Sequence, residues 1–271
     1  MYNLVSVFKQ HQQADDPSRL LATHLIEDAI RNKYADLPQA AFLRIFDRAW
    51  KQGMAAPDEA TLTARLRLLD APKTGSETDV ANQVILLLLI ERFWAPDAML
   101  TTPLQTIHAA LFGRNGSEEL RTEMEVEDFG GVACTEVREV RVRLDEIERF
   151  AHVFTPRLRG EGWEAKAMFL AHVFASVIRI HPFSDGNGRT ARMFVQYALR
   201  CWRLPFLPLP KVRNDAEWKQ ALIAAIQGDS LPLAMQFKGR MMANLAYDRA
   251  GDWPDKRPTN VRVVFPEGPP R

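Results

Sequence analysis

The sequence predicts an all-α protein, mainly a helical bundle, with a small β-hairpin flap beside a functional loop. Apolar residues recur at helical spacing through most of the 271 residues. In the middle of the chain, only residues 121–134 differ, because Thr122, Val126, Phe129 and Val132 surround a Gly-Gly pair in the pattern of a short hairpin. The composition, 46% hydrophobic and 25% charged, is that of a chain that buries a core and is not disordered.

The N-terminal part is predicted to form helices only. Asp16-Pro17 reads as an N-cap followed by proline at the first helical position, and it opens a helix at 17–34 with Leu21 and Leu25 on one stripe. Ser76-Glu77-Thr78-Asp79 likewise suits a helix N-terminus. The further helices predicted here span 38–52, a segment after Pro57-Asp58, 76–94 and 101–113.

The C-terminal part continues this pattern and ends in a different composition. Helices are predicted at 135–153, 164–180, 186–202, 215–227 and 231–247. From Gly251 the chain is rich in proline and charge, with one candidate strand at 260–265. We therefore expect an N-terminal helical region at 1–95, a core with the functional motif at 96–250, and an irregular tail at 251–271.

Charge and cysteine content exclude several classes of protein. With 35 basic and 34 acidic residues, the chain lacks the basic excess typical of proteins that bind nucleic acid. Cys134 and Cys201 are too few for a zinc set and predict two free buried thiols in a reducing compartment. The first residues do not resemble a signal peptide, and the most apolar run, 84–90, is too short to span a bilayer. We expect a cytoplasmic protein without membrane association.

One loop combines the features of an anion site. Pro182 ends the apolar helix at 164–180, and Gly186-Asn187-Gly188 begins the next helix. A glycine-rich helix N-terminus presents free backbone N–H groups and the positive end of the helix dipole, which suit phosphate. Arg189 and Arg192 lie in the first turns of this helix, where both are expected to reach the same anion.

The same loop supplies a base and a metal ligand. A neutral imidazole at His181, at the mouth of the anion site, suits proton abstraction from an attacking hydroxyl. Asp185 would point a carboxylate at the phosphates, so a divalent cation between them, Mg²⁺, is the natural solution. Phe183 is expected to pack the loop onto the core. Each residue alone is more often a cap or a turn residue, but their coincidence within a dozen positions favours a site.

The segment from His181 to Arg192 resembles the signature of the Fic family. It reads His-Pro-Phe-Ser-Asp-Gly-Asn-Gly-Arg-Thr-Ala-Arg and fills every fixed position of His-x-Phe-x-Asp/Glu-Gly-Asn-Gly-Arg-x-x-Arg. The resemblance covers roughly residues 78–240 and includes Ile107-His108, Leu120-Arg121-Thr122, Gly130-Gly131 and the segment 218–229.

The resemblance implies a mostly helical fold and transfer of AMP from ATP to a protein. His181 would deprotonate a Ser, Thr or Tyr hydroxyl of the target protein, whose oxygen attacks the α-phosphate while pyrophosphate leaves. Asp185 would hold Mg²⁺ on the α- and β-phosphates. The remaining signature residues would bind phosphate: Gly186, Asn187, Gly188 and Arg189 as a cradle, and Arg192 at the γ-phosphate.

Two further elements of the resemblance concern the target protein and the adenine base of ATP. The flap at about 126–132, with Val126, Phe129 and Gly130, would align the target segment by strand-like pairing. Trp218 is a candidate adenine contact, although a role as core anchor of its helix is an equal reading. Ile226 occupies a position where relatives often carry Asn near the adenine, which leaves base selectivity open.

A second motif resembles the inhibitory helix of many Fic proteins. Thr23-His24-Leu25-Ile26-Glu27-Asp28 follows Ser/Thr-x-x-x-Glu-Gly/Asn, with Asp28 as the one departure. In that reading Glu27, supported by Thr23, pairs with Arg192 and displaces the γ-phosphate. The alternative is an ordinary solvated glutamate on a helix.

The sequence leaves other functions open. An enzyme of the same fold could remove AMP, with Glu27 orienting a water, or catalyse both directions. A nucleotide-sensing interaction module that Glu27 keeps inactive is an alternative of another class, and UMP transfer is a third. The target, the modified side chain, a homo-oligomeric state and an antitoxin-like partner are not specified by these patterns.

Overall fold

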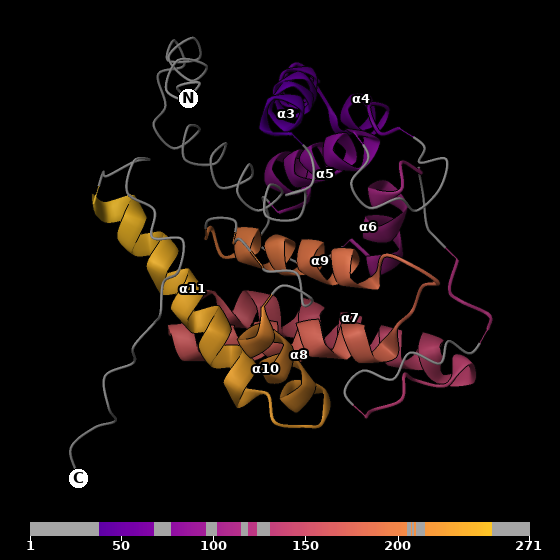
Figure 1. Cartoon of the computed structure of the whole chain (residues 1–271), viewed down its shortest axis with the longest axis vertical. Coiled ribbons are helices and arrows are strands. Elements are labelled where there is room, and N and C mark those ends of the chain that lie inside the picture. Colours follow the sequence, from indigo (N-terminus) through magenta and orange to yellow (C-terminus); the bar gives the residue numbers. More distant parts are fainter. Residues whose placement is uncertain are drawn as a thin grey trace.

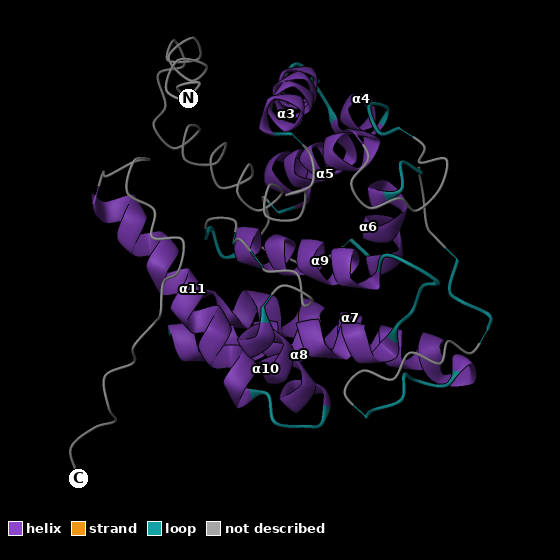
Figure 2. Ribbon diagram, viewed as in Figure 1, coloured by secondary structure: helices purple, strands orange, loops and turns teal. Residues whose placement is uncertain are grey.

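The computed structural model describes residues 38–67, 77–95, 102–114, 119–123, 131–204, 207, 209 and 215–250. These residues form helices and loops without a sheet, so the predicted all-α class is confirmed for them (Figure 2). The predicted hairpin flap falls largely on 124–130, outside the described part, and Val132 at its end forms only an isolated bridge.

The first group of helices comprises α3 (Gln39–Met54), α4 (Glu59–Thr63), α5 (Glu77–Leu89) and α6 (Leu104–Leu111). Helix α4 begins where the Asp58 carboxylate accepts a hydrogen bond from the Thr61 N–H at 2.7 Å, as an N-cap does. Helix α5 continues as a π-helix (Ile90–Trp94). Residues 82–90 are all buried, because α5 lies between α3 and α6 and has no solvent face there.

The second group comprises α7 (Val137–Arg157), α8 (Trp163–Ile180), α9 (Asn187–Cys201), α10 (Ala216–Ile226) and α11 (Leu231–Ala250). A short 3₁₀ turn (Leu158–Gly160) follows α7. Helix α9 runs through the centre of the molecule, with α3, α5 and α6 on one side and α7 and α8 on the other (Figure 1). Helix α11 packs on α8 and α10.

Buried polar contacts fix the central helix. The Gln196 amide donates to the Leu207 carbonyl at 2.6 Å and accepts from the Leu207 N–H at 2.8 Å. The Tyr197 hydroxyl donates to the Trp94 carbonyl at 2.7 Å. Because a buried polar group without a partner costs free energy, these bonds set the rotation of α9 as well as its position. Its first turn, which carries the predicted anion site, is thereby placed between the two groups of helices.

Helix existence agrees with the sequence prediction throughout the described part, and the ends differ by a few residues. Helix α7 runs on to Arg157 rather than 153, through Pro156. The predicted helix at 17–34 and strand at 260–265 lie outside the described residues. Neither Cys134 nor Cys201 forms a disulfide, and burial raises the pKa of the Cys201 thiol to about 12. Among the described helices, none has the length and apolar character needed to cross a membrane.

Trp218 is a core residue, which corrects its assignment as a candidate adenine contact. Its side chain is 0% exposed. The ring makes edge contacts with Phe174 and Phe237, at centroid distances of 5.6 and 5.1 Å, and Arg240 lies over its face at 5.4 Å. Stacking on a base would need an exposed ring face, and these neighbours cover it. Trp218 therefore anchors α10 on α8 and α11.

We predict that Trp218→Ala lowers the free energy of unfolding by about 3–5 kcal/mol, because it empties a filled core site. Trp218→Phe should cost less and leave ATP affinity unchanged. Denaturant unfolding and equilibrium nucleotide binding measure the two quantities. A Trp218→Phe protein that keeps wild-type stability but loses ATP affinity would show instead that the ring contributes to the nucleotide site.

Candidate active site

The loop between α8 and α9 begins with a residue in left-handed conformation. His181, with φ 49° and ψ 58°, caps α8, and its N–H donates to the Val177 carbonyl at 3.0 Å. A residue with a Cβ pays for this conformation, which glycine usually occupies at helix ends. The turn points the chain away from α8 and leaves the His181 side chain half-buried. Contacts elsewhere must hold the loop against this cost.

Arg121 holds the first residues of the loop. Its Nε donates to the His181 carbonyl at 2.6 Å, and its Nη2 donates to the Thr135 carbonyl. Its backbone N–H donates to the Pro182 carbonyl at 2.9 Å. Arg121 is 7% exposed, so these charge-assisted bonds lie in a protected environment. One buried arginine thus joins the segment 119–123, the segment 131–136 and the loop.

The middle of the loop is closed by Asn187 and Phe183. The Asn187 side chain accepts from the Phe183 N–H at 2.9 Å and donates to the Phe183 carbonyl at 2.6 Å. Phe183 is 1% exposed and stacks on His108 at a centroid distance of 3.8 Å, which confirms its predicted role of packing the loop onto the core. His108 Nε2 lies 2.7 Å from the Asp185 carbonyl, which can only accept, so Nε2 carries the proton.

The N-terminus of α9 depends on Gly186. This residue has φ 80°, and a Cβ on it would lie 2.7 Å from the Phe112 ring and 3.1 Å from His108 Nε2. Its carbonyl accepts from the N–H groups of Arg189 and Thr190, both at 2.9 Å. The N–H groups at the start of a helix lie beyond the reach of intrahelical acceptors and favour an anion. Those of Asn187 and Gly188 occupy this position at α9.

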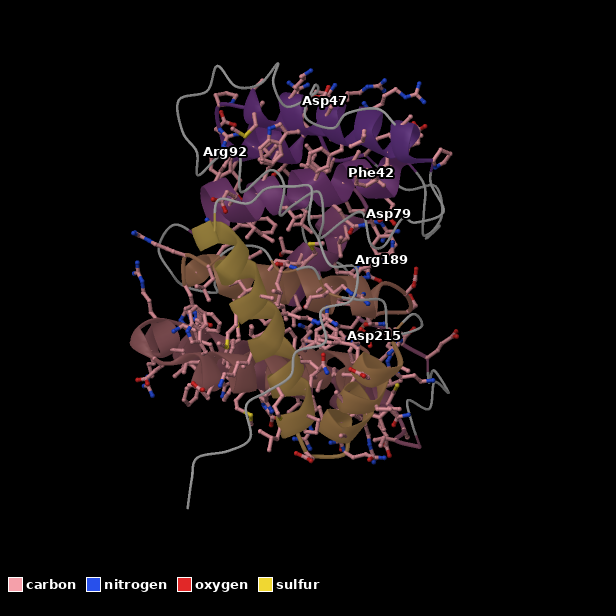
Figure 3. All side chains as sticks on the ribbon, turned by 60° about the vertical axis from the view of Figure 1, so that its left-hand side comes forward. Phe42, Asp47, Asp79, Arg92, Arg189 and Asp215 are labelled. Atoms are coloured by element: carbon pink, nitrogen blue, oxygen red, sulfur yellow. The ribbon has the colours of Figure 1, made fainter. Side chains whose placement is uncertain are left out.

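The Arg189 guanidinium is buried and held by two carboxylates. Its Nη1 lies 3.4 Å from Asp79 Oδ1, and its Nη2 donates to Asp185 Oδ2 at 2.8 Å. It also lies over the Phe112 ring, with its Cζ 4.5 Å from the centroid. The Arg189 side chain is 5% exposed, whereas that of Asp185 is 49% exposed. Figure 3 labels Asp79 and Arg189 where the N-terminal helices meet α9.

The second arginine of the motif lies closer to solvent. Arg192 is half-buried, and its Nη1 donates to the Gly188 carbonyl at 2.7 Å. This bond holds the guanidinium beside the first turn of α9. The residues from 181 to 192 that reach solvent are His181, Ser184, Asp185, Gly188 and Arg192.

The side chains of two predicted phosphate-binding residues are engaged within the protein. The Asn187 side chain is engaged on both sides by Phe183, so it organises the loop and leaves only its backbone N–H for an anion. The Arg189 guanidinium points into the core toward Asp79 and does not reach forward with Arg192. His181, Asp185 and Gly186 lie in the loop between α8 and α9, and Gly188 and Arg192 follow in the first two turns of α9.

Other predicted residues fall outside the described part, and some structural contributors carried no strong sequence signal. Thr23 and Glu27 of the inhibitory motif and Val126, Phe129 and Gly130 of the flap are not described. Residues whose roles could not be read from spacing are Asp79, His108 and Arg121. The last two lie in segments that entered only through the family resemblance.

The site has the chemistry to hold a divalent cation. Asp185 presents a half-exposed carboxylate next to a helix N-terminus, and Mg²⁺ in proteins commonly uses one or two carboxylates together with phosphate oxygens. The described residues contain no cluster of three His, Cys, Asp or Glu side chains able to hold a metal by themselves. This donor set fits Mg²⁺ brought with a nucleotide better than it fits a structural metal.

The comparisons agree with this geometry. Residues 100–199 match the family model of the Fic/DOC family. A Fic domain containing signaling protein from Bacteroides thetaiotaomicron superposes with a TM-score of 0.53 at 15% identity, over 86% of this chain and 100% of that one. A Fic family protein from Desulfovibrio desulfuricans gives a TM-score of 0.53 at 18% identity, over 91% and 70% of the two chains. No curated protein matched the chain.

We predict that Gly186→Ala destabilises the protein by about 1–3 kcal/mol more than Gly131→Ala does, measured by denaturant unfolding. Both glycines have nearly the same positive φ, 80° and 83°, so both variants are destabilised by an alanine in left-handed conformation. Only at Gly186 does the new Cβ meet Phe112 and His108, and overpacking adds to the cost. Equal losses in the two variants would contradict the close approach at Gly186.

Proposed function

Because this is a Fic family protein, with the Fic/DOC domain at residues 100–199, we propose that it transfers AMP from ATP to a hydroxyl side chain of a target protein and releases pyrophosphate. One observation carries the proposal. Within the signature loop, the side chains that reach solvent include the base, the carboxylate and the second arginine, while Phe183, Asn187 and Arg189 turn inward. That arrangement exposes the groups needed for phosphoryl chemistry and buries those that hold them.

His181 is proposed as the general base. Its imidazole would accept the proton of a Ser, Thr or Tyr hydroxyl as the hydroxyl oxygen bonds to the α-phosphorus of ATP. The bond from the α-phosphorus to the bridging oxygen of the β-phosphate breaks, and pyrophosphate leaves with the electron pair. The proton stays on His181 until it passes to solvent. The His181 main chain is fixed because its carbonyl accepts from Arg121 Nε and its N–H donates to the Val177 carbonyl.

The anionic groups of ATP would be held mainly by backbone dipoles. The N–H groups of Asn187 and Gly188 face the position of an anion at the α9 N-terminus, and Arg192 adds a guanidinium one turn further on. Asp185 would hold Mg²⁺, which neutralises charge on the phosphates during displacement. Because the donors are fixed before the substrate binds, little reorganisation is needed when charge shifts to the leaving group.

The proposed activity includes control by the N-terminal segment. The motif from Thr23 to Asp28 matches the inhibitory pattern except at its last position. A carboxylate at Glu27 that pairs with Arg192 would take the guanidinium from the γ-phosphate. The target polypeptide would be aligned by the flap at about 126–132. The proposal needs ATP, Mg²⁺ and a target protein, and no nucleic acid.

We predict that His181→Asn lowers the transfer rate by about 10²–10⁴-fold, as loss of a general base does, while ATP binding survives. Asparagine tolerates the left-handed conformation of residue 181 better than alanine, so the loop is kept. The measurement is incorporation of label from α-labelled ATP into proteins of a cell lysate. Transfer at the wild-type rate would remove His181 from the mechanism.

A companion variant separates the metal ligand from the base. Asp185→Asn keeps the shape of the side chain and its contact with Arg189 but removes the charge. It should abolish transfer and also weaken binding of ATP in the presence of Mg²⁺, which His181→Asn should not do. If the wild-type protein labels its targets equally well in EDTA, the role of Asp185 is wrong.

We also predict that Glu27→Gly raises automodification and target modification, and that adding Arg192→Ala removes the gain. Misplacement of a reacting group by about 1 Å can lower the rate about 100-fold, so loss of the inhibition by Glu27 should be easily measured. Glu77→Gly, on the exposed first turn of α5, provides a matched control because it makes the same replacement outside the motif. A Glu27→Gly protein no faster than wild type would place control outside this motif.

A further inference from the structure

Asp79 enters the active-site loop from a helix outside the matched family segment. It lies in the first turn of α5, whereas the Fic/DOC match begins at residue 100. Its side chain is 0% exposed, and Oδ1 accepts from Gln83 Nε2 at 3.0 Å and lies 3.4 Å from Arg189 Nη1. A charged side chain is rarely buried to this extent without a function or a strong partner.

Arg189 divides its guanidinium between the two carboxylates. Nη1 faces Asp79 and Nη2 donates to Asp185 Oδ2, so the contact with Asp185 uses one nitrogen and one oxygen. A two-pronged pair between arginine and a single carboxylate is stronger and would occupy both carboxylate oxygens. The position of Asp79 therefore keeps Arg189 from closing on Asp185 in that way.

The combined charge of Asp79, Arg189 and Asp185 favours binding of a cation at Asp185, the exposed residue of the three. Two carboxylates share the single positive charge of Arg189, so the three groups carry one net negative charge, and Asp185 is the one of them that is exposed. Without the Asp79 carboxylate, the positive charge of Arg189 would cancel that of Asp185. A cation would then meet a neutral pair, and its attraction to the site would weaken.

We propose that Asp79 is a positioning residue for the divalent cation: by taking up the charge and one nitrogen of Arg189, it keeps the Asp185 carboxylate available for Mg²⁺. The inference rests on the proposed function, since it assumes that Asp185 holds the cation that accompanies ATP. It extends the site to α5 and gives the buried arginine of the signature an electrostatic role in place of direct phosphate contact.

The test compares nucleotide affinity with and without the metal. The probe is the α,β-methylene analogue of ATP, which cannot release pyrophosphate, so the readout is independent of transfer. Calorimetry gives its Kd in Mg²⁺ and in EDTA, and the ratio of the two constants reports the contribution of the cation. Asp79→Asn should reduce this ratio by roughly 10-fold, the scale expected for one charge removed near a divalent ion.

A charge-restoring variant distinguishes electrostatics from packing. The double variant Asp79→Asn with Arg189→Gln removes both buried charges and restores the one net negative charge of the wild-type group, so its ratio should return to within about 3-fold of wild type. It also replaces a charged pair by two amides of similar shape, and it remains an adequate test if Asp79→Asn alone does not fold. Asp215→Asn, which disrupts the ion pair between Asp215 and Arg240 away from the loop, should leave the ratio unchanged.

Each outcome decides a different statement. A wild-type ratio near one would show that the cation does not assist the nucleotide, which counts against Asp185 as metal ligand in the proposed function. A large wild-type ratio that Asp79→Asn leaves intact would overturn the role of Asp79 alone. A double variant that stays as low as Asp79→Asn, or is low where the single variant does not fold, would reduce Asp79 to a packing residue.

Discussion

The conformation of the active-site loop depends on the double hydrogen bond between the Asn187 side chain and the backbone of Phe183. This contact joins the first residue of α9 to the middle of the loop and closes the turn that starts at His181. Both partners are buried, so water does not compete for the bonds. With the turn closed, Phe183 reaches His108 in the core, and His108 in turn holds the carbonyl of Asp185.

The same constraint explains why Arg121 is needed on the other side of the loop. His181 stands in a left-handed conformation that its Cβ disfavours, and such strain persists only where the surroundings determine it. Arg121 bonds to the His181 carbonyl and, through its backbone, to Pro182. The catalytic candidate is therefore fixed by hydrogen bonds to its main chain. This is the arrangement expected when side chains are positioned before substrate arrives.

The sequence predicted the helices and the identity of the loop but not the direction of several side chains. Periodicity sufficed for α5, α8 and α9 because each must bury an apolar face, whatever its partners. The inward direction of Arg189 was not predicted, because two arginines three residues apart look alike in the sequence. The contact with Asp79 on another helix distinguishes Arg189 from Arg192. Asp79 itself read as a helix-capping acid. Trp218 offered two equal readings, and only the packing of α11 across α8 and α10 decides between them.

These observations divide the signature residues into two groups with different roles, which residue types alone do not show. The polar atoms of the inward-facing residues, Phe183, Asn187 and Arg189, bond to one another, to Asp185 and to Asp79, so mutation of any of them would alter the shape of the loop first. Among the outward-facing residues, Asp185 and Arg192 make contacts within the same short segment, whereas the His181 main chain is held by Arg121. Because Asp79 from α5 pairs with Arg189, a helix before residue 100 contributes a charge to the site. A displacement of α5 relative to α9 would alter the contact between Asp79 and Arg189, and with it the charge around the Asp185 carboxylate. The positions of the backbone N–H groups at the start of α9 would be affected less directly.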